Sequence, residues 1–181
     1  MIALTSAETK IRSDADLVNA AQRGDASAFE ELYATYAPMV HGILLGRLAA
    51  FDADDVLQDV FMTAYTKLGS LREAAAFPAW IARIARNRAE DFRRGAVESV
   101  ELDVEYASRA SQSASLEAAQ ALAAIRELPD TYRETLTLRL VEGMTGPEIA
   151  QRTGLTHGSV RVNLHRGMEL LRAALEDKGN G

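Results

Sequence analysis

The C-terminal part of the chain carries a pattern that predicts two helices joined by a sharp turn. Thr145 and Glu148 have the spacing of a capping box, in which two side chains satisfy the free amides at the start of a helix. Gly154 supplies the positive φ that ends a helix, and Thr156 can cap the next one. These signals predict a helix-turn-helix, which places its second helix in a DNA major groove.

The second predicted helix has one apolar face and one polar face. Val160, Leu164 and Leu171 recur at helical spacing and are expected to face inward. Side chains that bind phosphates and base edges remain toward solvent, namely Ser159, Arg161, Asn163, His165, Arg166 and Arg172. An ordinary helical hairpin with a charged surface is the alternative interpretation.

The composition limits the chain to one or two small domains. Its 181 residues are 48% hydrophobic, and no apolar run approaches the length of a membrane span, so we expect no membrane insertion. The chain has no cysteine and three dispersed histidines, so we expect no disulfide, no metal site, no cofactor and a cytoplasmic location. The net charge of -6 predicts weak DNA affinity unless a partner supplies the missing positive charge.

Helical periodicity through nearly the whole chain predicts an all-α fold of two small helical domains joined by a flexible linker. We expect the first domain at residues 14–95. Residues 96–115 are acidic and serine-rich with few large apolar side chains, which is typical of a linker. Residues 116–176 are expected to form the second domain, a helix-turn-helix (winged-helix-like) DNA-binding domain.

A helix after Leu48 has an acidic face. Asp52 is expected to cap this helix, and Asp55 and Asp59 lie one turn apart next to Gln58. Without a neighbouring histidine or cysteine, these carboxylates do not indicate a catalytic or metal site. They predict either a docking surface for a basic partner helix or an ordinary solvated face.

The next helix, which begins near Pro78, separates an apolar side from a stripe of arginine and asparagine. Such a stripe can bind phosphates and, where the strands are separated, base edges. Trp80 lies at the border between the two faces. For Trp80, core packing and base stacking are the open interpretations. For the polar stripe, the alternative to nucleic-acid binding is an ordinary solvated face. The polar stripe contains Arg83, Arg86, Asn87 and Arg94.

Three segments in this order resemble an extracytoplasmic-function (ECF) sigma factor of the sigma-70 family. They are DADDVLQDVFMTAY at Asp52–Tyr65, FPAWIARIARNRAEDFRR at Phe77–Arg94, and LPDTYRETLTLRLVEGMTGPEIAQRTGLTHGSVRVNLHRG at Leu128–Gly167. The resemblance implies a transcription initiation factor and not an enzyme. Its implied partners are core RNA polymerase, through the clamp helices and the flap, promoter DNA and an anti-sigma factor, and the free protein is expected to be monomeric.

The resemblance also implies roles for single residues. It assigns core-polymerase binding to Asp55, Gln58 and Asp59. It assigns -10 recognition and melting to the loop at Ser70–Phe77 and the helix after it, with Arg72, Phe77, Trp80, Arg83, Arg86, Asn87 and Arg94. It assigns -35 recognition to Thr156, Ser159, Arg161, His165 and Arg166. Asn163 and Gly167 depart from the family pattern, in which an arginine and a small helix-forming residue are common.

Two other functions remain open from the sequence. A sigma-like mimic would sequester an anti-sigma factor without supporting transcription. A plain helix-turn-helix regulator would bind DNA alone, but it would not need the acidic helix or the Arg/Asn helix.

Overall fold

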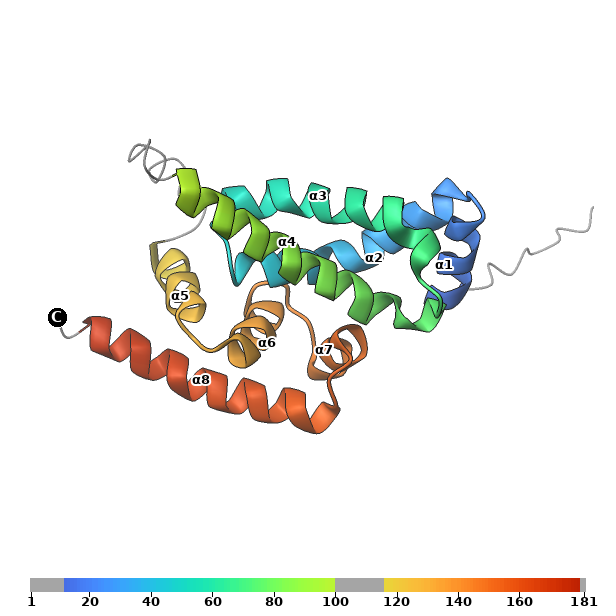
Figure 1. Ribbon diagram of the computed structural model, residues 1–181. Coiled ribbons are helices and arrows are strands. Elements are labelled where there is room, and N and C mark those ends of the chain that lie inside the picture. Colours follow the sequence, from blue (N-terminus) through green and yellow to red (C-terminus); the bar gives the residue numbers. More distant parts are fainter. Residues whose placement is uncertain (1–11, 100–115, 180–181) are drawn as a thin grey trace, which may run out of the picture.

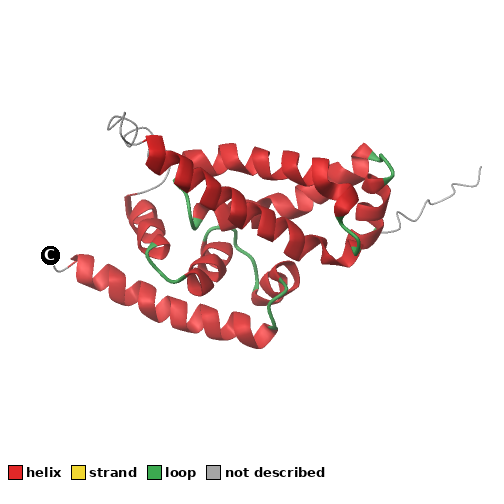
Figure 2. Cartoon of the chain, viewed as in Figure 1, coloured by secondary structure: helices red, strands yellow, loops and turns green. Residues whose placement is uncertain are grey.

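The computed structural model describes residues 12–99 and 116–179, and these residues are helical apart from short connections (Figure 2). The N-terminal half contains α1 (Asp14–Gln22), α2 (Ala26–Leu45), α3 (Ala50–Lys67), the short 3₁₀ helices η1 (Leu68–Ser70) and η2 (Ala74–Ala76), and α4 (Phe77–Ser99). The C-terminal half contains α5 (Leu116–Arg126), α6 (Asp130–Leu140), α7 (Gly146–Thr153) and α8 (His157–Gly179). Most of the expected linker, residues 100–115, lies outside the described residues.

Helices α1 to α4 form one bundle around α2 (Figure 1). The buried side of α2 includes Leu32, Tyr36 and Ile43, which are at most 2% exposed. Helices α3 and α4 both pack against α2, and α1 closes the end of the bundle. This arrangement leaves the outer faces of α3 and α4 available to other molecules.

The start of α3 corrects one expectation. The helix begins at Ala50, with Ala49 as its N-cap, and Ala49 makes no side-chain capping bond. Asp52 therefore lies in the first turn and does not cap the helix. Its negative charge still lies near the positive end of the helix dipole, which explains why the local sequence resembles a capped start.

The helix-turn-helix prediction is confirmed. The Thr145 amide donates to Glu148 Oε2 at 2.7 Å, and the Glu148 amide donates to Thr145 Oγ1 at 3.4 Å. Gly154 has φ 76°, and the Ser159 amide donates to Thr156 Oγ1 at 3.1 Å. Residues 116–179 contain no strand, so the domain has no wing.

The two halves pack directly against each other, which the sequence did not predict. Helices α6 and α7 lie between the N-terminal bundle and α8 (Figure 1). Leu138 and Ile149 belong to the same buried apolar cluster as Ile43 and Ile81.

The described residues include no helix that is both long and apolar enough to cross a membrane.

Candidate nucleic-acid interface

The outer face of α8 is exposed to solvent. Thr156, Ser159 and Arg161 are exposed at its start, and His165 and Arg166 are exposed one turn further along. The opposite face of the helix is anchored by Val160 and Leu171, which are 1% and 4% exposed. The structure thus brings the five predicted -35 residues onto one accessible surface at the N-terminal part of the second helix of the motif.

Asn163 does not belong to this surface, contrary to expectation. It is 7% exposed and, together with Thr135 and Leu155, lines a hollow of about 250 Å³. The buried stripe of α8 recurs at Val160, Asn163 and Gly167, which is one helical face. The position where the family resemblance implies an arginine is therefore turned inward here.

Gly167 has a packing role that the sequence did not reveal. A Cβ atom at this position would lie 3.0 Å from Leu136 Cδ1 and 3.2 Å from Tyr132 Cβ. Glycine costs about 1 kcal/mol relative to alanine inside a helix. At this position that cost accompanies a close approach of α8 to α6, because a Cβ atom would crowd two side chains of α6.

The two aromatic candidates at the start of α4 differ in how deeply they are buried. Phe77 is fully buried, and its ring centroid lies 5.2 Å from that of Tyr36. Trp80 is half-buried, and its ring lies 5.8 Å from that of Phe77. Arg72 is exposed just before η2. The expectation that Phe77 contacts DNA is corrected to a structural role, because a fully buried ring supports the loop from beneath.

Further along α4, Arg83, Asn87 and Arg94 are exposed as expected. Arg94 pairs with Asp91 on the same helix. Asn87 borders a hollow of about 220 Å³ between α3 and α4, which is also lined by Lys67. An amide and a cation around such a hollow can bind a phosphate or a base edge.

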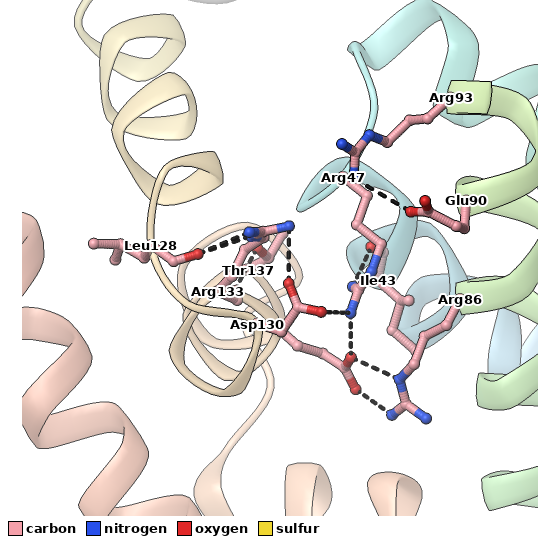
Figure 3. Close-up of polar contacts among 10 residues, drawn as sticks. Ile43, Arg47, Arg86, Glu90, Arg93, Leu128, Asp130, Arg133 and Thr137 are labelled. Carbon is pink, nitrogen blue, oxygen red and sulfur yellow. Dashed lines mark hydrogen bonds and ion pairs between the residues drawn. The ribbon is translucent and has the colours of Figure 1, made fainter. Parts of the chain in front are cut away.

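Arg86 differs from the other members of the polar stripe. Its Nε and Nη2 atoms donate to the two carboxylate oxygens of Glu134 on α6 at 2.9 and 2.6 Å. Arg47, which follows the end of α2, lies 3.4 Å from the same carboxylate and 3.7 Å from Asp130 (Figure 3). The bond to Glu134 raises the pKa of Arg86, whereas burial lowers the pKa of Arg47. Arg86 is thus engaged in a contact between the two halves and is not free for DNA.

The acidic face of α3 is exposed at Asp55, Gln58 and Asp59, while Val56 and Val60 are buried behind it. Met62, one turn further along, is 67% exposed. No metal-binding cluster of carboxylates occurs among residues 12–99 and 116–179. Carboxylates beside an exposed thioether suit docking to a protein partner that carries both cationic and apolar groups.

Two neighbours of the candidate DNA residues were missed from the sequence. Lys67 was missed because a lysine in the last turn of a helix is explained by the helix dipole alone. Glu134 was missed because its burial depends on the packing of one half of the chain against the other. The apolar periodicity of α6 could have indicated only that residue 134 is near a buried face.

His41 links three helical regions. Its Nδ1 lies 2.8 Å from Glu142 Oε1, and its Nε2 lies 3.3 Å from Asp54 Oδ1 on α3. The bond with Glu142 raises the pKa of His41, although partial burial opposes this. A protonated imidazole can donate to both carboxylates, so the contact is strongest when His41 is charged.

We therefore expect His41 to contribute to folding stability in a pH-dependent way. Because its pKa is raised in the folded state, the contribution is present below the reference pKa of 6.5 and is lost as pH rises through the folded-state value. Urea unfolding of the wild-type chain and His41→Gln, at pH values from about 5 to about 9, measures this difference. His157→Gln, at an exposed position, is the control. A wild-type advantage that grew with pH would contradict the prediction.

Comparison with known proteins shows the family to which the chain belongs. Residues 32–97 match the family model for sigma-70 region 2, and residues 118–171 match the model for sigma-70 region 4. The chain is 33% identical over 182 residues to the RNA polymerase sigma-H factor of Pseudomonas aeruginosa, covering 90% of this chain and 94% of that protein. It is 30% identical over 176 residues to the ECF RNA polymerase sigma-E factor of Escherichia coli strain K12, covering 88% and 92%.

The fold has a solved counterpart as well. The structure of CnrH in complex with the cytosolic domain of CnrY matches with a TM-score of 0.61 at 28% identity, covering 91% of this chain and 97% of that chain. Both family regions, the order of the helices and near full-length similarity to these relatives lead to one conclusion. The chain belongs to the ECF group of the sigma-70 family, the RNA polymerase subunits that recognise promoters and initiate transcription.

Proposed function

We propose that three exposed surfaces of this sigma factor each bind a different target. The acidic face of α3, with Asp55, Gln58 and Asp59, binds the clamp helices of core RNA polymerase. The exposed side of α4 and the loop before it bind the -10 element and assist melting. The outer face of α8 binds the -35 element.

The observation that carries this proposal is the exposure of polar side chains on three separate helices, each backed by a buried apolar face. Asp55 and Asp59 stand in front of Val56 and Val60 on α3, and Arg161 stands opposite the buried side of α8. The acidic surface suits a basic protein, and the two surfaces with arginine suit nucleic acid. Two domains, residues 14–95 and 116–176, would then contact opposite ends of one promoter.

The remaining roles follow from this function. The chain supplies binding and positioning, and the polymerase supplies the chemistry, so we infer that the chain is not itself an enzyme. Its place of action is the cytoplasm, where bacterial RNA polymerase and DNA are found. We propose an anti-sigma protein as its regulator, supported by the complex of the similar protein CnrH with CnrY.

Reconstituted transcription tests the proposal against a sigma-like mimic. The chain is added to bacterial core polymerase on genomic DNA fragments, and specific transcripts are measured against core alone. Specific initiation supports the proposal. Binding to core without any specific transcript would instead indicate the mimic, and DNA binding without core binding would indicate a plain helix-turn-helix regulator.

The -35 surface makes a separate prediction. Arg161→Ala and Arg166→Ala are each expected to weaken binding of the polymerase complex to a promoter containing its -35 element. The slope of log affinity against log salt should fall by about 1 for each phosphate contact removed. Arg23→Ala, which removes an equal charge from an exposed position after α1, is the control. An unchanged affinity and salt slope in both variants would remove these residues from the interface.

A further inference from the structure

Helix α1 lies beside the connection between α3 and α4 (Figure 1), and Gln22 is the last residue of this helix. The Nε2 atom of Gln22 donates to the main-chain oxygen of Leu68 at 2.9 Å and to that of Leu71 at 2.8 Å. Because a carbonyl oxygen only accepts hydrogen bonds, the amide nitrogen and not the amide oxygen must face this pair. Both hydrogens of the side-chain amide are therefore used on a single turn of the connecting loop.

The turn that Gln22 holds comes directly before a candidate DNA residue. The turn contains η1, and the Leu71 amide closes it by donating to the Leu68 oxygen at 3.0 Å. The side chains of Leu68 and Leu71 are 3% and 9% exposed, whereas the next residue, Arg72, is exposed. The direction in which the chain leaves Leu71 therefore sets the position of Arg72.

Between this turn and α4, small side chains hold the loop. Ala74 and Ala76 are partly buried against the core, while Arg72 and Glu73 are exposed. An alanine side chain buries little apolar area, so it contributes little to holding the main chain in one place. The next large buried side chain is Phe77, where α4 begins. The two bonds from Gln22 are therefore a large share of what fixes the first part of the loop.

The position of Gln22 is itself fixed by the end of α1. Val18, one turn earlier on the same face of the helix, is fully buried. The helix ends in a tight turn, in which Gly24 has φ 95° and the Asp25 amide donates to the Ala20 oxygen at 3.1 Å. A side chain on such a rigid element holds a loop in one place, whereas a side chain on a mobile segment would move with the loop.

We propose that Gln22 is a positioning residue for recognition of the -10 element. It fixes the turn at Leu68 and Leu71 so that Arg72 meets the DNA in one orientation, and it acts through Arg72 without contacting the DNA itself. This inference rests on the proposed function, which assigns -10 binding to this loop and to α4. Gln22 is exposed, so it matters for discrimination between promoter sequences more than for folding.

The variant Gln22→Met tests this role, since methionine has about the length of glutamine but carries no hydrogen-bond donor. Transcription is measured with core polymerase on a promoter from which the wild-type chain initiates, and on copies with single base substitutions in the -10 or the -35 element. Losing two neutral hydrogen bonds should lower the discrimination between -10 sequences on the order of tenfold, with -35 discrimination unchanged. Gln22→Glu keeps the shape but turns oxygen atoms toward both carbonyls, so its loss should be at least as large.

The control is Gln120→Met, which makes the same chemical change at an exposed position of α5 and should leave both discrimination ratios unchanged. A purely structural role of Gln22 would lower transcription from every template by the same factor and would leave the ratios intact. That result, or a wild-type ratio in Gln22→Met, would overturn the proposal.

A double-mutant cycle with Arg72→Ala measures whether Gln22 acts through Arg72. Gln22→Met should lower -10 discrimination on the order of tenfold in the wild-type chain, but by less than about twofold in the Arg72→Ala chain. Equal losses in the two backgrounds would show that the two residues act independently and would contradict the positioning role.

These outcomes differ from a failure of the proposed function. A wild-type chain that did not discriminate between -10 sequences would refute the proposed function, and the role of Gln22 would fall with it. If the wild-type chain discriminates, Arg72→Ala does not, and Gln22→Met behaves as the wild-type chain does, then the proposed function stands and only the role of Gln22 is refuted.

Discussion

Replacing Phe77 by alanine is expected to lower the free energy of unfolding by about 3–5 kcal/mol, the range for truncating a fully buried aromatic residue. Phe77 has no exposed surface, and its ring packs edge-on against Tyr36 of α2 and next to Trp80. The cavity would lie where α4 begins, beneath the loop that is proposed to bind the -10 element and assist melting. Urea denaturation followed by circular dichroism measures the change.

The control is Phe51→Ala, which makes the same chemical change at a position that is 59% exposed. It should cost less than about 1 kcal/mol. Phe77→Leu keeps most of the apolar volume and should retain promoter opening if the role of Phe77 is structural. A cost below about 1 kcal/mol for Phe77→Ala, or loss of opening in a stably folded Phe77→Leu chain, would contradict a purely structural role.

The second large effect is expected at the acidic face of α3. Asp55→Ala combined with Asp59→Ala should weaken binding to core polymerase by about 100-fold or more, since two charge-assisted contacts of about 1.5–3 kcal/mol each contribute at least about 3 kcal/mol together. Specific transcription should fall in parallel at sub-saturating concentrations of the chain. Binding can be measured with a fluorescent label on the chain and a titration of core polymerase.

Both carboxylates are exposed, so the double variant should unfold within about 0.5 kcal/mol of the wild-type chain. Glu30→Ala combined with Glu127→Ala removes the same charge from exposed positions elsewhere and should bind core normally. If the two double variants lost affinity equally, a general charge effect would replace the specific interface on α3.

Sequence patterns that involve only neighbouring residues predicted the helix boundaries best. The capping box at Thr145 and Glu148 and the left-handed Gly154 depend on neighbours within one turn, and all three behave as predicted. The acidic face of α3 and the exposed side of α4 also followed from helical periodicity alone. Asp52 shows the limit of such rules, because a carboxylate near a helix start satisfies both a cap and a first-turn position.

Packing between the halves decided the positions that the sequence did not predict. Arg86 has the same helical spacing as its exposed neighbours, yet it is bonded to Glu134, which lies far along the chain. Asn163 is polar but faces inward, because α8 buries a wide stripe against the rest of the domain. Gly42 and Gly46 carry the GxxxG spacing of closely packed helices, a signal that was present in the sequence and was overlooked.

The central claim is that the two halves of the chain recognise opposite ends of one promoter on the polymerase. Mapping of transcript 5′ ends, made by purified core polymerase and this chain on genomic DNA, tests it most directly. We predict that the starts share two sequence blocks at a fixed separation, centred about 35 and about 10 base pairs upstream. Arg161→Ala should relax only the upstream block, and Asn87→Ala only the downstream block. Starts that share no sequence, or variants that relax both blocks alike, would contradict the claim.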